Sequence, residues 1–231
     1  MVAEPLDQVH FHGKGHDRLV PGAVGHIIVA SILSLPASIL LSKVMIPGDE
    51  TTPANVGSSS MYRSSMDAVS TGAEDGMKMY LSILAMLIAM ISLVALANIL
   101  LGNILVFGEP LSFERIAGWI FAPIVWLIGV PAADAATAGS LMGTKTILNE
   151  LIAYLNLAAL PPDTLTARSK LLMVYAMCGF ANLGSVGMMI GSISALVPSR
   201  REEIVELSLK SIIPGTLSTC MTAAVIGLLP G

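Results

Sequence analysis

The stretch LLMVYAMCGFANLGSVGMMIGSISALVPS, residues 171–199, runs for 29 positions without a charged residue. As a helix it would exceed the roughly 30 Å hydrocarbon core of a bilayer, because each residue rises about 1.5 Å. Four glycines stand near its centre, around Asn182 and Ser185. Each costs a helix about 1 kcal/mol relative to alanine, which favours a membrane helix unwound between Gly179 and Ser185. The alternative is close helix packing at small residues.

The composition indicates that lipid is the solvent for much of the chain. Of its 231 residues, 54% are hydrophobic and 12% are charged. A soluble domain carries about 25% charged residues, and half that fraction leaves too little polar surface to cover a globule. The net charge of −4 gives no basic patch, so nucleic acid is not an expected partner. Cys178 and Cys220 lie in apolar runs and are expected to be small buried side chains.

Further apolar segments lie on both sides of the polar regions. Residues 27–46 are long enough for one span with a kink at Pro36, and residues 79–107 predict a tilted span. Residues 211–231 predict the last span. Between the first two spans, residues 47–78 predict a polar connection that contains either a short interfacial helix or a solvated loop.

The region after the second span is interrupted. Residues 116–133 are uncharged, but they are short and contain two prolines. Residues 134–162 carry charges, yet they are rich in helix formers and small residues and do not have the composition of a loop. Short apolar segments interrupted by Gly and Pro are typical of discontinuous or re-entrant helices in transporters. We therefore expect a re-entrant element here.

Glu150, in the sequence TILNELIAY, is the unexpected residue of that region. An ionised carboxylate at the centre of a membrane helix costs at least about 2.5 kcal/mol on the insertion scale. Glu150 is therefore expected to face a wet cavity or a hydrogen-bonding ligand. In the alternative, the segment is a loop and Glu150 is solvated, paired with Lys145.

A second candidate set consists of Phe180, Asn182 and Ser185, in CGFANLGS. An amide and a hydroxyl beside unwound backbone supply donors and acceptors, and the aromatic ring supplies an apolar wall. With a carboxylate nearby, this set suits a neutral polyol such as a sugar. In the alternative, Asn182 and Ser185 only cap the half-helices beside the break. The sequence has no pattern typical of a serine hydrolase, a zinc protease or a P-loop enzyme, and we do not expect an enzyme.

These two stretches, in their order and spacing, resemble the concentrative nucleoside transporter family. The motifs that carry the resemblance are GTKT-x-LNE-x-x-AY at 143–154 and CGFAN-x-x-S at 178–185. The resemblance implies an all-α integral membrane fold: a multi-span helical bundle with a re-entrant hairpin and a broken transmembrane helix, half of an inverted-repeat transporter. Residues 1–21 are polar and are expected to be disordered. The resemblance implies a C-terminal membrane domain of the nucleoside transporter type at 22–231.

The resemblance also implies nucleoside transport by cation symport, with sodium as the expected coupling ion and no cofactor. By motif, Glu150 is expected to bind the ribose hydroxyls, Asn182 and Ser185 to contact the ribose, and Phe180 to be their aromatic neighbour. The implied setting is the lipid bilayer of a bacterial inner membrane. The implied assembly is a homotrimer whose transport domain moves in an elevator-like displacement.

The family's N-terminal half is not found in this sequence. That half supplies a first hairpin with a G-Q-T-E-type motif and a broken helix, which hold the nucleobase contacts and the sodium site. The expectation is therefore a split or truncated gene. In the first case this chain supplies the ribose-binding half of the substrate site and works with a separate N-terminal half. In the second it is a non-transporting membrane fragment with at most an oligomerisation or regulatory role.

Overall fold

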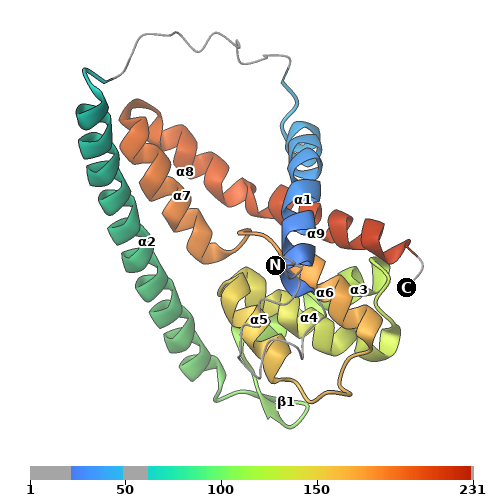
Figure 1. Ribbon diagram of the computed structural model, residues 1–231. Helices are drawn as coiled ribbons and strands as arrows, with labels where there is room; N and C mark the ends of the chain where they lie inside the picture. Colours follow the sequence, from blue (N-terminus) through green and yellow to red (C-terminus); the bar gives the residue numbers. More distant parts are fainter. Residues whose placement is uncertain (1–21, 49–61, 230–231) are drawn as a thin grey trace, which may run out of the picture.

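The computed structural model describes residues 22–48 and 62–229, which form helices and a small β-hairpin (Figure 1). The expectation of a disordered segment at 1–21 lies outside the described residues. In chain order the elements are α1 (Ala23–Met45), α2 (Ser65–Leu101), β1 (Leu105–Val106), β2 (Glu109–Pro110), α3 (Phe113–Leu127), α4 (Ala132–Ile147), α5 (Glu150–Ala159), α6 (Ala167–Met177), α7 (Leu183–Leu196), η3 (Pro198–Arg200), α8 (Arg201–Lys210) and α9 (Ile212–Gly227).

Within the described ranges, α1 and α2 are the two single helices long and apolar enough to cross a bilayer. α1 falls where the first span was predicted and continues as a helix through Pro36. α9, the predicted last span, is shorter, but together with α8 and η3 it forms a bent pair of span length, with an angle of 42° at the break. The predicted positions of the first and last spans are therefore confirmed as apolar helices.

The second span begins earlier than predicted. Ser64 caps α2 by accepting a hydrogen bond from Asp67 N at 3.2 Å, and the helix then continues without a break into the apolar residues. The prediction of a separate interfacial helix or a loop is therefore wrong for residues 65–78. The other half of that connection, residues 49–61, lies outside the described residues.

The second span also ends earlier than predicted. α2 stops at Leu101, and residues 105–110 form the antiparallel hairpin β1–β2 instead of the last turns of a helix. Phe107 and Gly108 make its turn, both with positive φ angles of 54° and 79°. Glycine adopts such angles without strain, so Gly108 favours a turn at the end of the apolar run that predicted a helix up to residue 107.

α3 and α4 form a helical hairpin within the region where a re-entrant element was expected. They have 15 and 16 residues, so each is at most about 24 Å long and too short to cross a core of about 30 Å. The arms meet in a tight turn at residues 128–131, where Gly129 has a φ of 105°. The predicted boundary between residues 133 and 134 thus falls in the first turn of α4, and the interrupted region consists of short helices, as expected.

The two arms of this hairpin touch backbone to backbone through glycines. A Cβ atom on Gly143 would lie 2.5 Å from the carbonyl oxygen of Glu114, and one on Gly139 would lie 2.6 Å from that of Gly118. Side chains cannot occupy such distances, so only glycine permits this approach. Gly139 and Gly143 have the GxxxG spacing that membrane helices use for close packing.

α6 and α7 are the two halves of the broken helix. α6 ends at Met177 and α7 begins at Leu183, so residues 178–182 leave the helix where the unwound segment was predicted. The later glycines have a different explanation, because they lie inside α7. A side chain on Gly187 would overlap Met86 of α2. The break and the close packing of small residues therefore both occur, at different positions.

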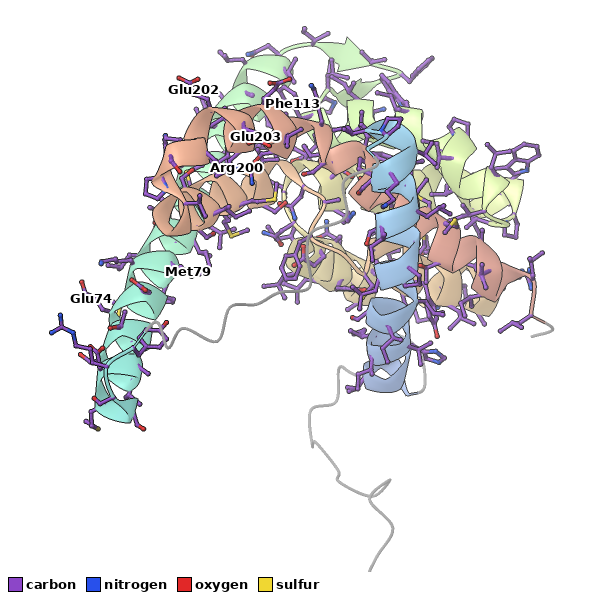
Figure 2. The ribbon with its side chains drawn as sticks, turned by 90° about the horizontal axis from the view of Figure 1, so that it is seen from above. Glu74, Met79, Phe113, Arg200, Glu202 and Glu203 are labelled. Carbon is purple, nitrogen blue, oxygen red and sulfur yellow. The ribbon has the colours of Figure 1, made fainter. Side chains whose placement is uncertain are left out.

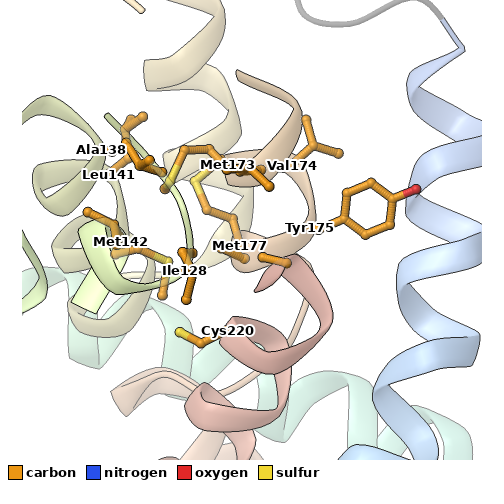
Figure 3. Close-up of a cluster of buried hydrophobic side chains, with 14 of the residues drawn as sticks. Ile128, Ala138, Leu141, Met142, Met173, Val174, Tyr175, Met177 and Cys220 are labelled. Carbon is orange, nitrogen blue, oxygen red and sulfur yellow. The ribbon is translucent and has the colours of Figure 1, made fainter. Parts of the chain in front are cut away.

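The hydrophobic core lies where α4, α6 and α9 meet (Figure 3). Met142 and Met177 are fully buried there, and Cys220 joins them from α9 as the expected small buried side chain. Cys178, at the break, is only partly buried. The ring of Tyr175 points from this cluster towards α1, where its hydroxyl and His26 Nδ1 form a hydrogen bond of 2.8 Å.

α2 lies at the edge of the molecule. Figures 1 and 2 show it well apart from α1, and its charged start, marked by Glu74 in Figure 2, projects beyond the other helices. Its main contact is with α7. The apolar side chains of α1 and α2 are largely exposed in this chain. This pattern fits helices that face lipid or further protein.

We expect Gly143→Ala to destabilise the hairpin by about 1–3 kcal/mol, because the methyl group would overlap the backbone of α3. Gly76→Ala is the matched control, since nothing lies within 4 Å of the added methyl group on α2. It should be neutral or stabilising, because alanine favours a helix by about 1 kcal/mol. Thermal unfolding in detergent compares the variants. Equal melting temperatures for G143A and the parent would contradict the backbone contact.

Candidate functional site

Glu150 is the first residue of α5, directly after a break that separates α5 from α4. Asn149 caps this helix, and its Oδ1 accepts a hydrogen bond from Ile152 N at 2.9 Å. A carboxylate in the first turn of a helix lies at the positive end of the helix dipole, which stabilises its negative charge. Glu150 is partly buried. Its segment is therefore helical and is not the solvated loop of the alternative interpretation.

The pairing of Glu150 with Lys145 is not observed. Among the ion pairs of the described residues, none joins these two side chains. Lys145 is fully buried in the last turn of α4, and its Nζ has no hydrogen-bond partner within the described part of the chain. The partner of Glu150 comes instead from the broken helix.

Asn182 joins the two motifs that the sequence singled out. Its Nδ2 donates a hydrogen bond to Glu150 Oε2 at 3.2 Å, and its Oδ1 accepts one from Ser185 N at 2.7 Å. The side chain is almost completely buried, with 1% of its surface exposed. A single amide thus caps α7 and orients the carboxylate of α5.

Ser185 completes the cap of α7. Its Oγ accepts a hydrogen bond from Asn182 N at 3.2 Å, and the two residues together form a reciprocal capping box. The same hydroxyl lies within donating distance of the carbonyl oxygens of Phe180 and Asn182. The interpretation of Asn182 and Ser185 as caps is therefore correct for α7. It leaves a second role open for both residues, because the cap lies directly beside Glu150.

Phe180 lies on the open side of the break, with 71% of its surface exposed. It borders a cavity of about 450 Å³ between α2, α7 and the start of α9, and Ser185 also lines this cavity. The apolar lining includes Ile83, Met188 and Ile212. Glu150 is not part of that lining. The structure therefore joins Glu150 to Asn182 and joins Phe180 to Ser185, without enclosing all four in one pocket.

Asp134 was not a candidate site residue, but it links the hairpin of α3 and α4 to the broken helix. Its Oδ2 accepts hydrogen bonds from Thr166 N at 3.0 Å, from the Thr166 hydroxyl at 2.9 Å and from the Ser169 hydroxyl at 2.5 Å. Thr166 is the N-cap of α6. The tip of the hairpin and the start of the broken helix are thus fixed to each other.

Tyr154 is a further residue that was not a candidate. Its hydroxyl donates a hydrogen bond to the carbonyl oxygen of Val174, near the end of α6, at 2.7 Å. The sequence contained an indication of this role, because Tyr154 is the last residue of the motif that contains Glu150 and lies four residues later, on the same helix face.

The described residues contain no candidate metal site. No three His, Cys, Asp or Glu side chains cluster within residues 22–48 and 62–229.

A sequence model described as the C-terminus of Na⁺-dependent nucleoside transporters matches residues 26–227. The nucleoside permease NupC of Helicobacter pylori is 37% identical over 213 residues, which cover 89% of this chain and 51% of that protein. The uncharacterized transporter YutK of Bacillus subtilis is 35% identical over 212 residues, covering 89% and 52%. The mouse solute carrier family 28 member 3 is 32% identical over 226 residues, covering 88% and 32%.

Solved structures of the transporter CNTnw share the fold. An inward-facing, substrate-bound state has a TM-score of 0.69 at 34% identity, covering 88% of this chain and 49% of that one. A doubly substituted form in an outward-facing state has a TM-score of 0.76 at 33% identity, covering 89% and 51%. This chain spans about half the length of CNTnw and of the bacterial relatives.

The bond between Asn182 and Glu150 can be tested by reversing its polarity. Asn182→Asp keeps a good N-cap, because Asp and Asn cap helices equally well. It also places a second carboxylate against Glu150, and we expect it to lower the free energy of unfolding by about 1–3 kcal/mol. Adding Glu150→Gln supplies an amide that donates to the new carboxylate, and most of the loss should be recovered.

Thermal unfolding of the two single variants and the double variant in detergent measures the coupling between the sites. Glu150→Gln alone is the control for removing the charge of Glu150. A double variant no more stable than N182D would mean that the two side chains do not face each other.

Proposed function

The chain belongs to the family of Na⁺-dependent nucleoside transporters, and we propose that it supplies the ribose-contacting half of a nucleoside site. Family membership confirms the resemblance read from the two motifs and the helical membrane fold. It also places the chain in a family of membrane transporters and not of enzymes.

The hydrogen bond from Asn182 to Glu150 is the observation that carries this proposal. It brings the two motifs together and gives the carboxylate a fixed orientation. A carboxylate has about four acceptor positions, so one bond from Asn182 leaves room for two vicinal sugar hydroxyls. Hydrogen bonds to an ionised group are about twice as strong as neutral ones, which suits the recognition of an uncharged polyol.

Ser185 and Phe180 extend the proposed site towards the cavity beside the break. The Ser185 hydroxyl can rotate between the carbonyl oxygens of the break and a ligand oxygen. The exposed ring of Phe180 offers an apolar face for the sugar or the base. In this role the four predicted residues act from three neighbouring positions: the start of α5, the break, and the start of α7.

We further propose that transport is driven by a sodium gradient and needs the segments that longer relatives carry beside this half. The family description names sodium dependence, and this chain spans about half the length of its bacterial relatives. The exposed apolar faces of α1 and α2 provide surfaces for those segments and for lipid. The proposed setting is the inner membrane of a bacterium, with a homotrimer and an elevator-like movement as in the family.

The test is uridine uptake in membrane vesicles under a sodium gradient, with this chain alone and with the chain co-produced with the N-terminal half of a relative. We expect sodium-dependent uptake from the pair. Uptake by neither preparation would favour the other candidate, a non-transporting fragment that at most oligomerises or regulates.

In the active preparation, we expect Glu150→Gln to weaken uridine binding about fivefold to tenfold, because it replaces a charge-assisted acceptor with a neutral one. Glu202→Gln is the matched control. It is the same chemical change, made at an exposed residue of α8 far from the break. An affinity unchanged by E150Q would remove Glu150 from the site.

A further inference from the structure

We propose that Tyr154 is a positioning residue: together with Glu150 it holds both halves of the broken helix from one face of α5. Tyr154 does not contact the substrate in this proposal, and its effect on the site passes through the break. We call the two hydrogen bonds, from Asn182 to Glu150 and from Tyr154 to Val174, the clamp. The role of Glu150 as a ligand-binding group rests on the proposed function, whereas the clamp is independent of it.

The break in the helix creates a specific need at the end of α6. The last four carbonyl groups of a helix lack their usual N–H partners. In a continuous helix, the Val174 carbonyl would accept from Cys178 N, but Cys178 N bonds to Tyr175 O at 3.2 Å instead. Val174 is buried, and a buried carbonyl without a partner costs about 1–3 kcal/mol. The Tyr154 hydroxyl meets this need at 2.7 Å.

The other half of the broken helix is held from the same face of α5. Glu150 and Tyr154 are four residues apart, so their side chains lie next to each other one turn apart. Glu150 accepts from Asn182, the N-cap of α7, and Tyr154 donates to α6. One short helix thus reaches both sides of the break, at two points.

In the proposed arrangement, the two hydrogen bonds tie the ends of α6 and α7 at the break to one helix, α5. α6 also packs on α9, and α7 also packs on α2. The two hydrogen bonds act at the break itself, where residues 178–182 have left the helix. With both contacts made, any tilt of α5 is passed to the two halves together. The positions of Phe180 and Asn182, which lie between the halves, depend on both hydrogen bonds.

The environment of Tyr154 supports a positioning role. Its ring packs against the buried cluster of the core, and its hydroxyl proton is directed to a backbone carbonyl. It is not among the residues that line the cavity at Phe180. The side chain therefore acts on backbone geometry.

The experiment compares Tyr154→Phe with Tyr175→Phe, which also removes one hydrogen-bonded phenol oxygen. The Tyr175 hydroxyl bonds to His26 of α1 at 2.8 Å, so this control loses a bond of similar length on α6 itself, without freeing a carbonyl of the break. The first readout is the alkylation rate of Cys178 by N-ethylmaleimide in native membranes without nucleoside, resolved by peptide mass spectrometry. Cys178 is partly buried at the break, whereas Cys220 is buried in the core and reports on global unfolding.

We expect Y154F to raise the alkylation rate of Cys178 several-fold and leave that of Cys220 unchanged. The second readout is uridine affinity in the chain paired with an N-terminal half. We expect Y154F to weaken it about threefold to tenfold, the range that one lost hydrogen bond produces. Y175F should change both readouts less than twofold.

An alkylation rate of Cys178 in Y154F equal to that of the parent would overturn the proposal, and so would equal effects of Y154F and Y175F. If the parent protein binds no uridine but Y154F still exposes Cys178 selectively, the proposed nucleoside site fails while the clamp stands. If uridine binds and neither readout responds to Y154F, the clamp fails while the nucleoside site stands.

Discussion

A helix broken inside a bilayer depends on one constraint: its freed backbone groups must find partners within the protein, because lipid offers none. In this chain the constraint is met at both ends of the break. The Tyr154 hydroxyl donates a hydrogen bond to a carbonyl oxygen near the end of α6. The side chains of Asn182 and Ser185 accept hydrogen bonds from backbone N–H groups at the start of α7. The polar side chains at the break therefore satisfy backbone hydrogen bonds before they serve any ligand.

The rest of the fold brings these partners into place. The glycine contacts between α3 and α4 bring two helices too short for a span into one compact hairpin, and Asp134 fixes its tip to the start of α6. α5 follows directly from the second arm and carries Glu150 and Tyr154 to the break. The hairpin and the broken helix thus form one unit, in which each supplies groups that the other lacks.

Much of this could be predicted from the sequence, because hydropathy and glycine content report on lipid contact and helix continuity. The break, the hairpin and the proximity of Glu150 to Asn182 followed from such signals and from the family motifs. The ends of α2 did not, because hydropathy does not distinguish apolar residues in a helix from those in the turn at Gly108. The hydrogen bond from Tyr154 to Val174 was also missed, because a bond to a backbone carbonyl leaves no pattern in the sequence of its acceptor.

The two interpretations of Asn182 and Ser185, as helix caps and as ligand contacts, are not alternatives in this fold. A cap needs an acceptor that faces the first turn of α7, and Asn182 Oδ1 supplies it. The Nδ2 donor of the same amide is not used by the cap. That donor reaches Glu150, so the requirement to cap the helix also fixes the orientation of the carboxylate. In this way, the side chains that cap the backbone at a broken helix can also form most of a binding site. The carboxylate of Glu150 is the main group that the caps do not supply.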